Sequence, residues 1–150
     1  MQPLTFPRPY AFTTRTIDNR REILDPLRQQ YVALTPEEWV RQNLVQFLIQ
    51  DREYPRGLMA AEKFLEVHGQ PHRADLVVYD RQGSPLLVAE CKEPSVNISQ
   101  ETFNQIAHYN RALRASYLLI TNGIQHYCYA IDRDKEKYIF LDHLPHYGNL

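Results

Sequence analysis

The alternation of apolar and polar positions is clearest from Arg73 to Lys92, in RADLVVYDRQGSPLLVAECK. Two apolar runs, LVVY and PLLVA, flank the turn-forming residues DRQGS, which is typical of a β-hairpin. We expect Asp75 to open the first strand, and Glu90 and Lys92 to close the second. Because side chains alternate between the faces of a strand, Glu90 and Lys92 share one face and Cys91 points to the other.

A helix start is indicated at Thr35, where the sequence reads TPEEWV. Threonine suits the N-cap, Pro36 suits the first helical position, and Glu38 stands three residues after the cap, as in a capping box. The helix is predicted to run to about Gln50. The apolar positions share one face at 3.6 residues per turn, and Glu37 falls in the middle of that face.

The remaining pattern predicts an irregular, Pro-rich arm over residues 1–20 and a strand-turn-strand unit over 23–35. Residues 58–69 are predicted to form the first strand of the main sheet. A second helix is predicted from Gln100 to about Arg114, followed by a buried strand in SYLLITNG and a closing hairpin.

The predicted fold class is α/β, with a mixed central β-sheet flanked by helices in the order α-β-β-β-α-β-β. A length of 150 residues suits a single domain with one core. We expect residues 1–34 to form an N-terminal arm and hairpin, and residues 35–150 to form the core.

Composition gives little indication of a partner, because the net charge is only −1. Binding to a polyanion would require a local basic surface. Seven arginines are candidates for it, although scattered solvated charges explain most of them equally well: Arg20, Arg21, Arg28, Arg41, Arg73, Arg111 and Arg114.

The two cysteines, Cys91 and Cys128, lack Cys-x-x-Cys spacing and fit free thiols in a reducing compartment. No apolar run approaches the length of a membrane span, and residues 1–22 contain no signal-peptide core. We therefore expect a cytoplasmic location and no membrane partner.

An Asp, a Glu and a Lys at the ends of buried strands make a poor core, because buried charges are costly unless paired or bound to a metal. This arrangement resembles the PD-(D/E)XK nuclease superfamily and, more narrowly, the N-terminal nuclease domain of type I restriction endonuclease R subunits. The similarity covers roughly Thr35 to Cys128. The helix segment FNQIAHYN, with Gln105 and Tyr109, resembles the Gln-x-x-x-Tyr motif of RecB-type members. The sequence has Ala74 where the superfamily motif often has proline.

The resemblance implies a restriction-endonuclease-like fold and a divalent cation, Mg²⁺ with Mn²⁺ able to substitute, held by Asp75, Glu90 and the backbone carbonyl of Cys91. Magnesium favours oxygen ligands and keeps several waters. Lys92 would orient or deprotonate the attacking water, or stabilise developing negative charge. The sequence does not separate these roles.

Two further carboxylates are candidates for the same site. The first helix of superfamily members commonly sends a glutamate to the metal, which gives Glu37 a catalytic or ligand role. Equally well, Glu37 complements the helix dipole and pairs with Arg41 one turn later. Glu62 is a second candidate ligand, although a supporting or surface role suits it better.

The helical motif gives Gln105 a catalytic role, in which its amide bonds the attacking water, the lysine or the DNA backbone. The alternative is a solvated helix residue, with Tyr109 as half-buried core. Arg73, Tyr109 and Arg41 are the predicted nucleic-acid contacts.

The leading hypothesis is a metal-dependent deoxyribonuclease, related to restriction or repair, whose partner is DNA. An alternative from another class is a catalytically silent DNA-binding or protein-docking module on the same fold. Cleavage that requires metal distinguishes the two. An RNA-directed nuclease is a third interpretation. A homodimer or a larger restriction-type complex is compatible with each. No Gly-Lys-Ser/Thr phosphate loop is present, so no ATP-driven motor is expected.

Overall fold

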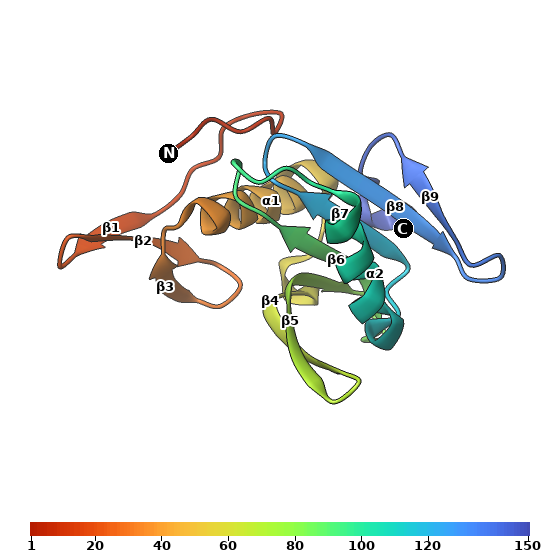
Figure 1. Cartoon of the computed structure of the whole chain (residues 1–150). Coiled ribbons are helices and arrows are strands. Elements are labelled where there is room, and N and C mark those ends of the chain that lie inside the picture. Colours follow the sequence, from red (N-terminus) through yellow and green to blue (C-terminus); the bar gives the residue numbers. More distant parts are fainter.

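A six-stranded mixed sheet lies between two helices at the centre of the molecule, in a computed structural model that describes all 150 residues (Figure 1). The strand order is β4-β5-β6-β7-β8-β9, and only the β6–β7 pair is parallel. The predicted α/β class is confirmed. The elements are α1 Pro36–Arg52, β4 Met59–Val67, β5 Gln70–Tyr79, β6 Pro85–Cys91, α2 Gln100–Leu113, β7 Tyr117–Thr121, β8 His126–Asp132 and β9 Lys137–Leu141, with short 3₁₀ turns at Arg56–Leu58 and Tyr147–Asn149.

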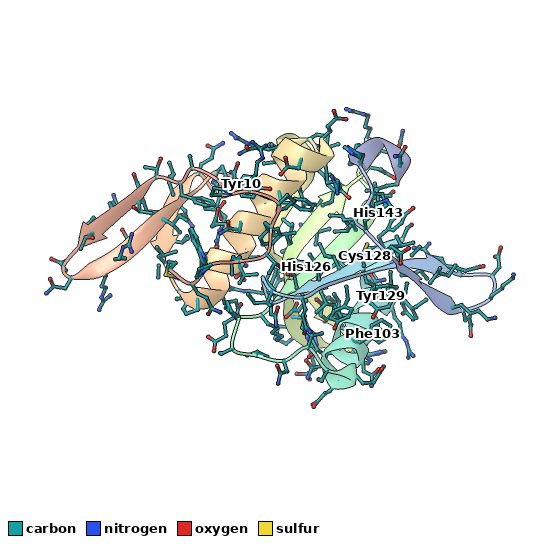
Figure 2. The ribbon with its side chains drawn as sticks, turned by 90° about the horizontal axis from the view of Figure 1, so that it is seen from above. Tyr10, Phe103, His126, Cys128, Tyr129 and His143 are labelled. Atoms are coloured by element: carbon teal, nitrogen blue, oxygen red, sulfur yellow. The ribbon has the colours of Figure 1, made fainter.

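Three strands follow α2, one more than the predicted order allows. Both arms of the closing hairpin join the sheet, because β8 pairs with β7 and β9 then pairs with β8. Phe103 of α2 packs edge-on against Tyr129 of β8, with ring centroids 5.0 Å apart (Figure 2). The helix therefore packs against the closing hairpin.

A separate three-stranded sheet precedes the core, where we expected only a hairpin. It comprises β1 Thr14–Ile17, β2 Arg20–Asp25 and β3 Gln30–Ala33. The additional strand, β1, was missed inside the segment predicted to be irregular. Asp18 and Asn19 both have positive φ, 50° and 64°, as a tight hairpin turn requires. The β1–β2 hairpin extends away from the core (Figure 1).

Helix α1 begins as the sequence predicts, because the Thr35 hydroxyl accepts a hydrogen bond from the Glu38 N–H at 3.0 Å. The predicted capping-box role of the Glu38 carboxylate is wrong. That carboxylate is buried and accepts hydrogen bonds from Arg28, Arg41 and Gln42 instead. Paired guanidinium groups bind it more strongly than one exposed backbone N–H would.

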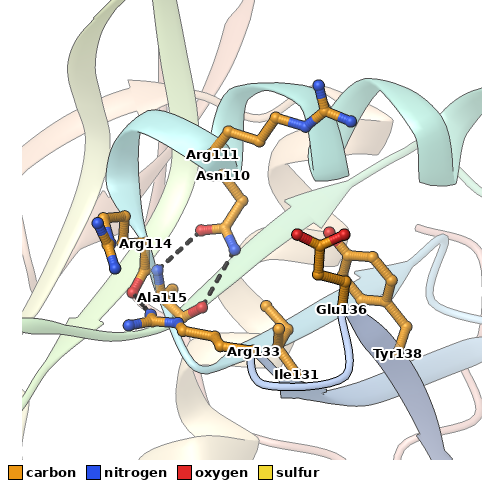
Figure 3. A pocket seen from close by; sticks show the side chains of 8 residues that line it. All are labelled: Asn110, Arg111, Arg114, Ala115, Ile131, Arg133, Glu136 and Tyr138. Carbon is orange, nitrogen blue, oxygen red and sulfur yellow. Dashed lines mark hydrogen bonds between the residues drawn. The ribbon is translucent and has the colours of Figure 1, made fainter.

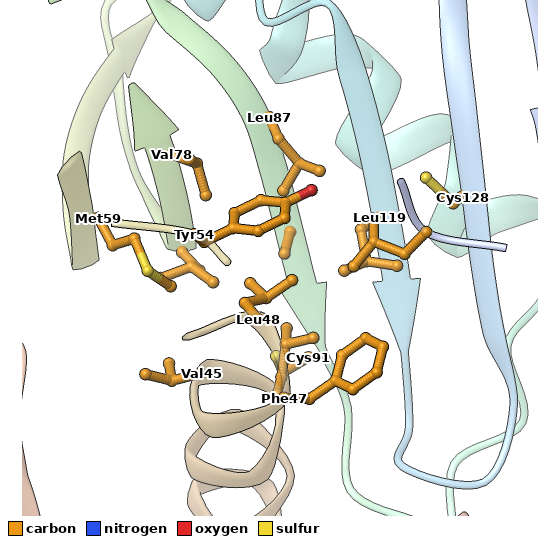
Figure 4. Close-up of a cluster of buried hydrophobic side chains, with 14 of the residues drawn as sticks. Val45, Phe47, Leu48, Tyr54, Met59, Val78, Leu87, Cys91, Leu119 and Cys128 are labelled. Carbon is orange, nitrogen blue, oxygen red and sulfur yellow. The ribbon is translucent and has the colours of Figure 1, made fainter. Parts of the chain in front are cut away.

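The two helices cover opposite faces of the sheet. Leu44 and Leu48 of α1 are buried against one set of strand residues, which includes Leu87 and Cys91 (Figure 4). The alternate strand positions, such as Val88, pack with α2. Each fully buried aliphatic side chain contributes roughly 1.5–3 kcal/mol to folding, so this alternation fixes the register of the central strands.

The hairpin of β5 and β6 is confirmed, but Asp75 lies in the middle of β5 instead of opening it. Strand β5 begins earlier because β4 turns back directly into it. His68 and Gly69, with φ of 51° and 75°, form that turn. The pairing of β4 with β5 therefore runs from Met59–Val78 to Val67–Gln70.

The N-terminal arm packs against the core. The Thr5 N–H donates to the Gly123 carbonyl at 2.8 Å, and the Phe6 ring lies 4.8 Å from the His126 ring, which is labelled in Figure 2. None of the helices has the length and apolar character that crossing a membrane demands.

Candidate active site

Asp75 and Glu90 lie side by side where the pairing of β5 with β6 ends. The last pair of the register is Leu76 with Ala89, and Asp75 and Glu90 are the next residues on the two strands. Only 7% of Asp75 is exposed, and its Oδ2 accepts a hydrogen bond of 2.7 Å from the Cys91 N–H. Burial and the neighbouring Glu90 charge raise the pKa of Asp75 to about 8. Carboxylates placed side by side in this way repel each other, and a bound cation would relieve the repulsion.

Two side chains hold Glu90 from separate elements. The Lys92 ammonium lies 3.5 Å from Glu90 Oε1, and the hydroxyl of Tyr109 on α2 donates to Glu90 Oε2 at 2.8 Å. Lys92 remains partly open to solvent, with 29% of its side chain exposed. The predicted common face of Glu90 and Lys92 is therefore present, and α2 covers it.

Cys91 projects to the opposite face, as the alternation predicts. Its side chain is buried in the cluster beneath α1, where desolvation raises the pKa of the thiol. The thiol is therefore unreactive core, and only the backbone of Cys91 is available to the site.

A hollow of about 410 Å³ opens beside Lys92 and brings in residues from both helices. Glu37 comes from the first turn of α1, and Gln105 is exposed on α2. The full lining is Glu37, Lys92, Glu93, Val96, Ser99, Glu101, Thr102 and Gln105. The structure thus places Glu37 and Gln105 beside the predicted lysine.

Glu37 is half-buried and makes no salt bridge with Arg41, so the alternative i,i+4 pairing is absent. Desolvation raises the pKa of Glu37; Arg41 and Lys92 lower it, while Glu90 and Glu62 raise it further. Its carboxylate therefore lies in the electrostatic field of the site.

Arg41 is buried, although the sequence analysis predicted that it contacts nucleic acid. Its side chain is 5% exposed and contacts Glu38 at 3.1 Å, Glu62 at 2.6 Å and Asp75 Oδ1 at 3.5 Å. The predicted contact of Arg41 with nucleic acid is wrong, because three carboxylates already occupy the buried guanidinium. Arg41 instead positions the Asp75 carboxylate from helix α1.

Glu62 stands opposite Asp75 on β4, on the side away from Glu90. The register pairs Ala61 with Leu76 and Lys63 with Ala74, which leaves Glu62 facing Asp75. Its φ of 54° is rare for a non-glycine residue in a strand and costs roughly 1–3 kcal/mol. The carboxylate is turned to Arg41, so Glu62 supports Asp75 through Arg41.

The two remaining predicted nucleic-acid contacts, Tyr109 and Arg73, have different outcomes. Tyr109 is 7% exposed and bonded to Glu90, so it is a positioning residue, and its predicted contact with nucleic acid is wrong. Arg73 is exposed on β5, paired with Phe64 across the sheet, and has no ion-pair partner. Its contact with a phosphate stays a prediction.

Arg28 was predicted only as a candidate for a basic surface, and its structural role was missed. Arg28 bridges Asp25 and Glu38, and so connects the small N-terminal sheet to the carboxylate that holds Arg41. No local pattern marks Arg28, because its two partners come from separate elements.

The oxygen donors suit a hard cation. No group of three or more His, Cys, Asp or Glu side chains is gathered to ligate a metal ion. A pair of carboxylates is nevertheless the protein contribution that Mg²⁺ commonly takes, because this ion keeps several of its waters. Asp75 and Glu90, which repel each other in the absence of a cation, form such a pair.

Comparison with known proteins places the chain in a family. Among curated proteins, none matches the sequence. One similar solved structure is the type IIG restriction endonuclease BpuSI, at 18% identity and a TM-score of 0.43, over 73% of this chain and 13% of that endonuclease. The model of the type I restriction enzyme R protein N-terminus family matches residues 36–145, which include α1, the sheet and α2. The chain belongs to the type I restriction enzyme R protein N-terminus family.

Proposed function

We propose that this chain is a metal-dependent nuclease that hydrolyses phosphodiester bonds in DNA as part of a restriction system. The observation that carries the proposal is the cluster of Asp75 and Glu90 at the end of the β5–β6 pairing, with Lys92 3.5 Å from Glu90 at the edge of a hollow. Family membership supports the link to restriction. The free thiols of Cys91 and Cys128 fit a cytoplasmic setting.

Asp75, Glu90 and the carbonyl of Cys91 would hold the cation, Mg²⁺ or Mn²⁺. When bound, the cation lowers the pKa of a coordinated water and neutralises charge on the phosphate. Glu37 is a further carboxylate in the same region, since it lines the hollow together with Lys92.

The remaining side chains position the reacting groups. The Lys92 ammonium donates toward the hollow, where it can orient the attacking water or stabilise charge on a phosphate oxygen. Gln105 offers an amide to the same water or to the DNA backbone. Tyr109 and Arg41 hold Glu90 and Asp75 in place, so each carboxylate has a fixed orientation before the substrate arrives.

The test is cleavage of supercoiled plasmid, linear duplex, single-stranded DNA and RNA, each with Mg²⁺, Mn²⁺ or chelator. Lys92→Ala should reduce metal-dependent cutting by about 100-fold or more, the usual contribution of a positioned acid–base or charged group. Lys63→Ala is the matched control, because Lys63 is an exposed lysine on β4 with no ion-pair partner. Equal cleavage by Lys92→Ala and wild type would remove Lys92 from the mechanism.

A silent DNA-binding or protein-docking module is the second candidate, and one observation favours it. The carboxylate oxygens of Asp75 and Glu90 already have protein partners: the Cys91 N–H, Arg41, Lys92 and Tyr109. Such a module would bind DNA, or another subunit of a restriction complex, equally well with chelator present. Asp75→Asn would then leave binding unchanged, and no substrate of the panel would be cut.

A further inference from the structure

Three arginines surround a pocket of about 490 Å³ at the C-terminal end of α2 (Figure 3). Arg111 and Arg114 come from the end of the helix, and Arg133 comes from the turn between β8 and β9. Glu136 is the only acidic residue of the lining, which also includes Asn110, Ala115, Ile131 and Tyr138. The pocket lies outside the candidate active site and has an excess of positive charge.

None of these arginines has a carboxylate partner. Their guanidinium groups form no salt bridge, and all three residues are exposed. The one hydrogen bond that they make within the pocket runs from the Arg133 guanidinium to the Arg114 carbonyl. The buried Arg41 and the half-buried Arg28, by contrast, are matched with acids. The donors around the pocket are therefore free to bind an anion.

The backbone beneath the arginines is fixed. The buried Asn110 side chain accepts from the Ala115 N–H at 2.9 Å and donates to the Ala115 carbonyl at 3.1 Å (Figure 3). This pair of bonds clamps the turn after α2, including Arg114, which caps the helix with a φ of 63°. The backbone that carries Arg114 is therefore fixed before a ligand binds.

The chemistry of the pocket favours phosphate in a nucleic acid. Guanidinium groups bind phosphate oxygens through paired, directed hydrogen bonds. The Tyr138 ring lines the same pocket with 38% of the residue exposed, so it offers an aromatic surface beside the arginines. Aromatic rings next to basic groups are typical of surfaces that contact nucleic acids.

Helix α2 connects this pocket to the candidate active site. Gln105 lines the hollow beside Lys92, and Arg111 and Arg114 follow six and nine residues later on the same helix. At 1.5 Å and about 100° per residue, they lie about 9 and 14 Å farther along the axis and are turned about 240° and 180° around it from Gln105. The pocket therefore lies on another side of the helix from the hollow.

We propose that Arg111, Arg114 and Arg133 form a phosphate-binding subsite for the DNA backbone, separate from the candidate active site. The proposal rests on the proposed function for its choice of DNA as the ligand. It identifies the local basic surface that a chain with a net charge of −1 needs in order to bind DNA.

The test is equilibrium binding of a fluorescent DNA duplex by the full chain, followed by anisotropy over a range of salt concentrations with chelator present. The double variant Arg111→Gln/Arg114→Gln should reduce the slope of log K against log salt by about 1.8, since each lost phosphate contact removes about 0.9. At about 0.1 M salt this equals a loss of roughly 60-fold in affinity. Arg133→Gln should reduce the slope by about half as much.

Arg56→Gln is the matched control, because Arg56 is exposed after α1 and forms no ion pair. It should bind DNA as the wild type does. Thermal unfolding of each variant identifies any loss of affinity that comes from misfolding. A double variant that folds and keeps the wild-type slope would overturn the subsite, as would a wild type that does not bind DNA.

Binding in chelator keeps this result separate from catalysis. If the wild type cuts no substrate but the double variant loses slope, the subsite stands and the nuclease proposal fails. If the wild type cuts and the double variant keeps both slope and cleavage, the subsite fails alone. Binding of a nucleoside triphosphate that the double variant loses, with duplex affinity unchanged, would assign the pocket to a small phosphorylated ligand and also overturn the proposal.

Discussion

The Tyr109 hydroxyl donates a 2.8 Å hydrogen bond to Glu90 Oε2, so a residue of α2 fixes the orientation of a carboxylate at the end of β6. Desolvation and the charge of Glu90 raise the pKa of this phenol, which therefore stays a donor at every physiological pH. The opposite oxygen of Glu90 faces Lys92. The tyrosine four residues after Gln105 therefore positions Glu90.

Replacing Tyr109 with phenylalanine removes this bond and keeps the ring. A hydrogen bond to a charged group is worth roughly 1.5–3 kcal/mol, so we expect cleavage to fall by about 10-fold to 100-fold. The measurement is the single-turnover rate with Mg²⁺. Tyr127→Phe is the control, because Tyr127 lies on β8, two strands from Glu90 in the sheet, and forms no hydrogen bond with it. Wild-type cleavage by Tyr109→Phe would show that the orientation of Glu90 does not limit the reaction.

Arg41 should be essential to stability. Replacing it with methionine leaves Glu38, Glu62 and Asp75 without their common cation, and breaking a buried ion pair in this way costs about 3–5 kcal/mol. Urea denaturation measures the loss.

The matched control is the exposed pair of Arg8 and Asp51, 2.9 Å apart, with 52% of the Arg8 side chain exposed. Removing Arg8 in the same way should cost at most about 1 kcal/mol. Equal losses from the two variants would mean that the Arg41 cluster contributes no more than a surface ion pair does.

His126 should make stability depend on pH. Its Nδ1 lies 2.7 Å from Thr121 Oγ1 and its Nε2 lies 2.9 Å from Thr5 Oγ1, and burial lowers its pKa. The unfolded chain, with a histidine pKa of about 6.5, then binds the proton more readily than the folded one. Folding free energy is consequently lost as the pH falls through about 6.5 toward the lower folded pKa.

Urea unfolding at several pH values between about 7.5 and 5 measures this effect. His126→Gln should flatten the pH dependence over that window, whereas His108→Gln, at a histidine without such hydroxyl partners, should leave it as in the wild type. If the unfolding free energy of His126→Gln changes with pH as it does in the wild type, groups other than His126 cause the pH dependence.

The local parts of the fold could be predicted from the sequence because short-range physics specifies them. The Thr35 cap, the DRQGS turn and the alternation around Cys91 each follow from neighbouring residues. The strand β1 was missed because its four residues are all exposed and have no apolar alternation. Only its turn, at Asp18 and Asn19, indicates a hairpin.

The partners of site residues could not be predicted in the same way. Arg41 and Tyr109 are visible as helix positions, but their partners Glu62 and Glu90 come from strands 21 and 19 residues away. Which carboxylate each one meets depends on how the helices lie across the sheet. The sequence therefore indicated the charged groups, and the tertiary packing divides them into exposed and supporting residues.

Asp75 should link metal binding to stability. In the absence of metal, Asp75→Asn is expected to change stability little, because it removes both the repulsion between Asp75 and Glu90 and the ion pair of Asp75 with Arg41. Saturating Mg²⁺ or Mn²⁺ should stabilise the wild type by about 2.7 kcal/mol at a concentration 100 times the Kd, and should leave Asp75→Asn unchanged. Thermal unfolding with and without metal measures both effects, and Asp80→Asn, in the exposed β5–β6 turn, is the control that should keep the metal response. A metal shift of equal size in Asp75→Asn and wild type would place the cation elsewhere on the chain and remove Asp75 from its ligands.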